Sequence, residues 1–113
     1  MRKDEQIKRI CETLREMGEI TDYAYDHFKD PEAVSLPVAI YRRVAQPNTS
    51  ADGVVYHHGG GVDFELFADT PDEMAVLMDK VEALMDADEL FYNLTADTVY
   101  IDSQDFWESL YEL

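Results

Sequence analysis

Apolar and polar positions are patterned most clearly over residues 61–88, where a strand pattern passes directly into a helix pattern. Over 62–66, apolar residues alternate with acids, the period of two typical of a half-buried strand. A helix start follows: Thr70 can cap the first free amides, Pro71 suits the first helical position, and Glu73 completes a capping box. The pattern predicts one continuous helix over residues 70–87.

This helix has a single apolar face, because six residues recur at spacings of three and four: Met74, Leu77, Met78, Val81, Leu84 and Met85. Burying six such side chains contributes roughly 10 kcal/mol before chain entropy is subtracted. The helix therefore needs a matching apolar surface, and we expect it to lie across a sheet.

A second helical pattern covers residues 3–17, with an apolar stripe of Ile7, Ile10, Cys11, Leu14 and Met17. Gly18 is a plausible C-terminal stop. Because the stripe is narrow and the chain end is near, we expect this helix to pack on the rim of the domain.

Strand patterns occupy most of the remaining chain. They cover 36–44, 54–58, the stretch after residue 61, 90–95, 98–101 and 106–113. The three glycines at 59–61 fit either a hairpin turn or a bulge in one long, bent strand, and the bent strand is favoured. Residues 19–35 are ambiguous: Tyr23, Tyr25 and His27 could alternate on a short strand, or the segment could be an ordered loop.

These elements predict a single α+β domain over residues 1–113. Its sheet is mostly antiparallel, with four to five strands and two helices packed on it, in the order α-β-β-α-β-β. No internal repeat or linker interrupts it. The absence of a signal peptide or an apolar run of membrane-spanning length favours a protein that is cytoplasmic at synthesis.

Charge is unevenly distributed along the chain. The formal net charge is −16, and residues 61–113 carry fifteen acids but a single base, Lys80. Such a surface disfavours nonspecific contact with DNA or anionic membrane. The simplest interpretation is a solvated face; the alternative is a negative potential that serves a function.

Candidate chemistry is weak throughout. Cys11 on an apolar helix face is typical of a core thiol, and adjacent His57 and His58 would point to opposite faces of a strand. The glycines at 59–61 lack the Lys-Ser or Lys-Thr of a phosphate loop, and the acids at 86–89 lack calcium-loop spacing. We therefore expect no cofactor, no metal and no catalysis.

Several phrases together resemble one family of small proteins from long-tailed bacteriophages and prophages. The phrases are Tyr25-Asp26-His27-Phe28, residues 50–57 (SADGVVYH), residues 64–69 (FELFAD), residues 99–103 (VYIDS) and Leu110-Tyr111. The family comprises tail-completion, tail-terminator or head–tail joining proteins, often described as minor capsid proteins. The resemblance spans roughly residues 5–113; residues 59–61 differ, since a bulkier strand sequence is usual there.

The resemblance implies an α+β fold and assembly into a ring, commonly of six, at the top of the tail tube. It places loops such as 45–53 at contacts between copies, so Asn48 and Asp52 are expected there. Because this loop is polar and rich in Asn, Ser, Asp and Gly, we expect weak order in the free protein and protection after assembly. Arg42 and Arg43 are the nearby cations that could meet a neighbour's acids. The implied partners are other copies of the chain, the tail tube and the head connector, first in the host cytoplasm and then in the virion.

Two other functions compete with a ring-forming structural protein. A small acidic binding module, such as a DNA mimic that occupies a nucleic-acid-binding protein, would explain the acids of residues 61–113. An enzyme with an unrecognised acid-based site is the third possibility. A ring that forms reversibly with concentration favours the structural function, whereas a strict monomer that inhibits a DNA-binding protein favours mimicry.

Overall fold

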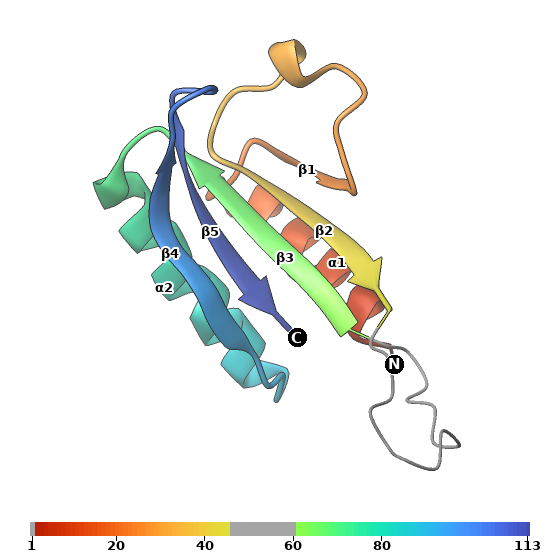
Figure 1. Ribbon diagram of the computed structural model, residues 1–113. Coiled ribbons are helices and arrows are strands. Elements are labelled where there is room, and N and C mark those ends of the chain that lie inside the picture. The colour runs from red at the N-terminus through yellow and green to blue at the C-terminus, as the bar shows by residue number, and fades with distance from the viewer. Residues whose placement is uncertain (1, 46–60) are drawn as a thin grey trace, which may run out of the picture.

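A computed structural model of the chain has two helices on one face of a five-stranded sheet (Figure 1). It describes residues 2–45 and 61–113. The elements are α1 (Lys3–Glu16), β1 (Asp22–Tyr25), the short 3-10 helix η1 (Pro31–Ala33), β2 (Val38–Val44), β3 (Gly61–Ala68), α2 (Pro71–Ala87), β4 (Asn93–Ile101) and β5 (Phe106–Glu112).

The sheet has the strand order β1-β2-β3-β5-β4. β1 pairs with β2 in parallel, and the other three pairings are antiparallel. The predicted α+β class with a mostly antiparallel sheet is confirmed. The ambiguous segment 19–35 contains the extra strand β1. The connection after β1 passes through η1 and leads into β2, which runs parallel to β1.

The core lies between the sheet and the two helices. β3 is central, and its side chains Val62, Phe64 and Leu66 are fully buried against the helices. β5 contributes Tyr111, whose hydroxyl donates a 2.6 Å hydrogen bond to the Glu82 carboxylate of α2. This bond ties the helix to the strand beneath it.

Helix α2 forms where its apolar pattern predicts. Met74, Leu77 and Val81 are buried, and Leu84 packs half-buried at the edge of the core. Thr70 caps the helix, since its hydroxyl accepts a 3.1 Å hydrogen bond from the Glu73 amide. The Glu73 carboxylate in turn accepts from the amide of residue 69, one position before the cap.

Helix α1 is more central than the sequence predicts. Ile7, Cys11 and Leu14 are fully buried, and the helix packs against β1, β2, β3 and α2. The predicted rim position is therefore wrong, because the three stripe residues fill the space between α2 and the β1 side of the sheet. Only Met17, half-exposed just beyond the helix end at Glu16, lies outside this packing.

The two predicted strands at 90–95 and 98–101 are in fact one strand, β4. One extra β4 residue lies between Leu94 and Ala96 and another between Ala96 and Val99, relative to β5. Thr98 adopts a positive φ of 54°, and its amide donates a 2.9 Å hydrogen bond to the Ser109 hydroxyl. Because the two extra residues bulge out of the pairing with β5, the strand continues through the turn-like residues 96–98.

The other strand predictions shift only at their ends. β2 begins at Val38, two residues later than the pattern indicates, and the strand predicted over 106–113 is confirmed as β5. The predicted strand 54–58 and the first two residues of the 59–61 glycine run lie outside the described residues, and Gly61 begins β3.

Candidate functional site

One face of the sheet carries neither α1 nor α2, and we call it the open face (Figure 1). Alternation along the strands, together with the pairing register, assigns side chains to it. They are Val38, Ile40, Arg42 and Val44 of β2, Asp63, Glu65 and Phe67 of β3, and Phe106, Glu108, Leu110 and Glu112 of β5. The face is thus apolar toward one end of the strands and charged toward the other.

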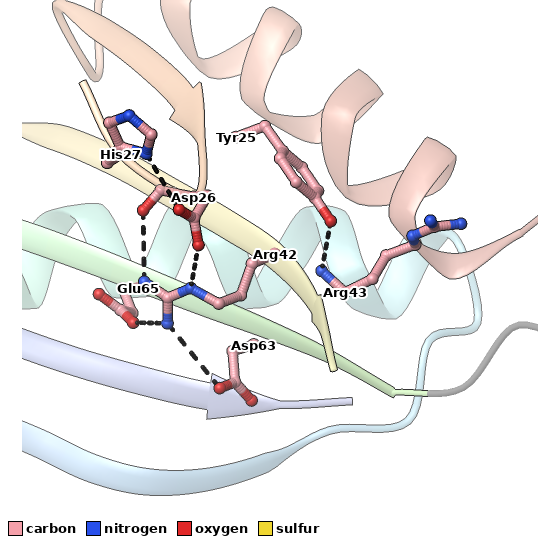
Figure 2. A network of polar contacts seen from close by, with 7 residues as sticks. All are labelled: Tyr25, Asp26, His27, Arg42, Arg43, Asp63 and Glu65. Atoms are coloured by element: carbon pink, nitrogen blue, oxygen red, sulfur yellow. Dashed lines mark hydrogen bonds and ion pairs between the residues drawn. The ribbon is translucent and has the colours of Figure 1, made fainter. Parts of the chain in front are cut away.

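Arg42 is the centre of the charged end (Figure 2). Its guanidinium lies 2.5 Å from the Glu65 carboxylate and 3.1 Å from that of Asp26, and Asp63 is 4.0 Å away. The Arg42 side chain is 31% exposed and that of Glu65 only 14%, so their pair is partly shielded from solvent. Three carboxylates surrounding one cation fix Arg42 in place.

Hydrogen bonds to Asp26 extend this cluster toward the β1–β2 connection. Nδ1 of His27 lies 3.0 Å from the Asp26 carboxylate. The bond with His27, followed by the bond with Arg42, holds the pKa of the Asp26 carboxyl below its usual value. Asp26 therefore stays ionised, and its ion pair with Arg42 joins the β1–β2 connection to β2.

Glu108 lies between the charged and the apolar ends of the open face. It is directly opposite Phe67 on β3 and Val99 on β4. Partial burial, and then the negative charge of Glu65, raise the pKa of the Glu108 carboxyl, while Arg42 opposes this rise. No hydrogen bond or ion pair of this carboxylate is present among residues 2–45 and 61–113.

An apolar pocket of about 380 Å³ lies at the other end of the open face. The β1–β2 connection supplies Phe28, Val34 and Leu36 to one wall, and the sheet supplies Ile40, Phe67 and Phe106 to the other. His27 and Gln104 are the polar residues on its lining. The volume lies within the range typical of small-ligand sites.

The edge strand β4 is the second unusual surface. Leu94, Val99 and Tyr100 are 41%, 46% and 42% exposed, and Phe91 just before the strand is 92% exposed. Asp97 is the only charged residue of β4. On its outer side the strand pairs with no other described strand. An edge of this length with exposed apolar side chains is a template for pairing with another chain.

The structure describes two of the four residues expected at contacts between copies, and it places these two on opposite faces of the sheet. Arg42 is on the open face and already paired, whereas Arg43 is exposed and aligned with Val62 on the helix-covered side. The Arg43 amide donates a 3.2 Å hydrogen bond to the Tyr25 hydroxyl. Asn48 and Asp52 lie outside the described residues. Their role at contacts remains a prediction.

Groups that could support catalysis or metal binding are sparse in the described part of the chain. Cys11 is fully buried, and burial raises the pKa of its thiol, which disfavours the nucleophilic thiolate. No cluster of three or more His, Cys, Asp or Glu side chains capable of holding a metal ion is found within residues 2–45 and 61–113. Over the same residues, no helix is long and apolar enough to cross a bilayer.

Sequence reasoning missed both the pocket and the β4 surface. The pocket combines apolar side chains from the β1–β2 connection, β2, β3 and β5. A usable signal was present, since Val38, Ile40, Phe67 and Phe106 make their strands apolar on both faces.

No protein-family model, curated protein or solved structure matches the chain.

Proposed function

We propose that the protein is a ring-forming structural subunit of a long-tailed phage, completing the tail tube and joining it to the head connector without catalysis. The resemblance of residues 25–28, 50–57, 64–69 and 99–103 supports this function. The α+β sheet with helices on one face agrees with the architecture that the resemblance implies. Assembly takes place in the host cytoplasm, and the subunit then remains in the virion.

The observation that carries the proposal is the edge strand β4. A chain with a net charge of −16 repels its own copies, so copies associate best where the surface has little charge. β4 offers a single acid, exposed Leu94, Val99 and Tyr100, and an edge of backbone groups for a neighbour's strand. Apolar and backbone contacts there can offset the repulsion between the acidic surfaces.

Ring formation sets a further condition on this contact. A β4-to-β4 contact is self-complementary and stops at a dimer, whereas β4 against a different surface of the next copy is heterologous and can close a ring. We assign β4 to a heterologous contact. The acids of residues 61–113 then line the lumen or the outer surface, and those in the lumen keep DNA from adhering as it passes.

The experiment that tests the function is particle assembly without the protein. Particles are produced from the phage or prophage that encodes the chain, with its gene deleted, and examined by electron microscopy. Filled heads and unattached tails should accumulate, and added purified protein should restore joining. Normal tailed particles in the deletion would refute the proposal.

Two variants connect this experiment to the proposed contact. Leu94→Lys places a charge at an exposed apolar position of β4 and should fail to restore joining. Val76→Lys introduces the same charge on the exposed side of α2, where Val76 is 55% exposed, and should restore it. Equal restoration by both variants would place the contact elsewhere on the subunit.

A DNA mimic is the second candidate function. The observation that favours it is the exposed row Asp72, Asp79 and Asp86 along α2, seven residues apart and therefore close to one line on the helix. A mimic predicts a monomer that inhibits a DNA-binding protein and loses inhibition when these aspartates become asparagines. Ring assembly predicts no such inhibition.

A further inference from the structure

The apolar pocket and Glu108 occupy adjacent positions on the open face. Phe67 lines the pocket and is directly opposite Glu108 in the β3–β5 register, and Phe106, two residues along β5, lines the pocket as well. Side chains two apart on a strand lie on the same face, about 7 Å from each other. A single short peptide segment of a partner can therefore reach both the pocket and the Glu108 carboxylate.

The pocket fits an apolar side chain of a partner. Its walls are mainly aromatic and aliphatic, from Phe28, Ile40, Phe67 and Phe106, and its volume of about 380 Å³ accommodates one aromatic or large aliphatic side chain with adjoining backbone. Burying such a group favours binding because its apolar surface leaves water. Apolar anchors in pockets are the usual source of affinity at protein interfaces.

The Glu108 carboxylate beside the pocket favours a cation next to the apolar side chain of the partner segment. Glu108 makes no ion pair or hydrogen bond with the described residues, although it is half-buried between apolar neighbours. Arg42, a cation whose charge acts on Glu108, is already engaged by Glu65 and Asp26. Since the whole chain carries a net charge of −16, a basic partner is also favoured at long range.

We propose that the open face is a docking site for a peptide segment of another protein, with an aromatic or large aliphatic side chain in the pocket and a neighbouring lysine or arginine against Glu108. This partner differs from the second copy that β4 contacts in the proposed ring. The pocket is separate from the proposed ring contact because no β4 residue lines it, although Glu108 is directly opposite Val99 of that strand.

Fluorescein-labelled seven-residue peptides provide the direct probe. Each has a central Trp, Leu or Ala between two lysines, and a fourth has the central Trp between two glutamates. Binding to the 113-residue chain is measured by fluorescence polarisation at about 150 mM salt. This salt concentration limits nonspecific charge attraction. The Trp and Leu peptides with lysines should bind. The Ala peptide should bind at least tenfold more weakly, the ratio expected for losing a buried anchor. The glutamate peptide keeps the anchor but should also bind at least tenfold more weakly, because like charges repel at Glu108 and across the acidic surface.

Variants locate the binding on the protein. Ile40→Trp fills the pocket and should weaken the Trp–lysine peptide at least tenfold, whereas Val76→Trp adds the same side chain to the far side of α2 and should not. Glu108→Gln should weaken it about fivefold, as expected for loss of a partly shielded ion pair. Glu16→Gln, an exposed position on α1 with the same change in net charge, should leave it unchanged.

Three outcomes would overturn the docking site. They are no binding of either apolar lysine peptide up to about 1 mM, equal binding by wild type and Ile40→Trp, and equal weakening by Glu108→Gln and Glu16→Gln. Circular dichroism spectra of the variants matching wild type exclude unfolding as a cause of lost binding. If head–tail joining fails while peptide binding persists, the two proposals are separated.

Discussion

Arg42 and Arg43 are consecutive on β2, yet they serve opposite sides of the sheet. Arg42 lies on the open face within 2.5 Å of Glu65, and Arg43 is exposed on the side where its strand partner is Val62. Neighbouring strand residues must point to opposite faces, so these two cations cannot act as one basic patch.

Replacing the two arginines should therefore have unequal effects on stability. Arg42→Gln leaves the Glu65, Asp63 and Asp26 carboxylates without their shared cation, and we expect a loss of about 1–2 kcal/mol in the free energy of unfolding. Arg43→Gln should remain within about 0.5 kcal/mol of wild type. Urea melts at pH 7 compare the two, and equal effects would show that the Arg42 cluster does not contribute.

Helix α2 gives the strongest prediction about the core. Leu77 is 1% exposed, and Leu77→Ala should cost about 2–5 kcal/mol, because the cavity left behind adds to the lost apolar transfer. Val76, the preceding residue, is 55% exposed, so Val76→Ala should change stability by at most about 0.5 kcal/mol. A neutral Leu77→Ala in a denaturant melt would mean that α2 presents a different face to the sheet.

Glu108 makes stability depend on pH in a specific direction. Folding raises the pKa of this carboxyl, through burial first and Glu65 second, so the folded state binds the proton more tightly than the unfolded chain. Its favourable contribution is complete below the unfolded pKa of about 4.3 and is lost as pH rises through the folded pKa. The ionised carboxylate therefore costs stability at neutral pH.

Glu108→Gln should accordingly be more stable than wild type at pH 7, and the difference should shrink toward zero near pH 3.5. Denaturant melts at both pH values measure it, with Glu16→Gln as the exposed control. If the variant is no more stable than the control at pH 7, the Glu108 carboxylate is not penalised by its surroundings.

Local patterns were sufficient to predict α2 and most of the sheet. The spacing of Met74, Leu77 and Val81 and the Thr70 cap are encoded within one segment, so they can be read without knowing what the helix contacts. β1 could not be predicted with the same clarity. It is four residues long and is stabilised by parallel pairing with β2, whose register no local turn indicates.

The site was less predictable because it depends on non-local contacts. The Arg42 cluster joins Asp26 to Glu65 across strands that the connections separate in sequence, and the pocket joins Phe28 to Phe106. Continuity of β4 through residues 96–98 depends on the irregular pairing with β5 and on the Ser109 hydroxyl. In each case the partner lies elsewhere in the chain.

The contact through β4 predicts that a single charge will prevent self-association. Leu94→Lys introduces a cation at an exposed apolar position of the edge strand, where it must be desolvated when a neighbouring strand pairs. We expect its dissociation constant to rise at least tenfold, as measured by sedimentation equilibrium, while Val76→Lys behaves like wild type. Equal behaviour of the two variants would exclude β4 from the contact.

The most direct test of the account is the molar mass of the protein by light scattering, measured against protein concentration at about 20 and 200 mM salt. Raising the salt shortens the Debye length from roughly 20 to 7 Å and screens the repulsion between chains of net charge −16. A ring closed through the apolar edge of β4 should assemble reversibly beyond a dimer, should assemble more strongly as the salt concentration rises, and should bind no duplex DNA. Association that weakens with salt, or stops at a dimer, would contradict a ring held by the apolar edge of β4.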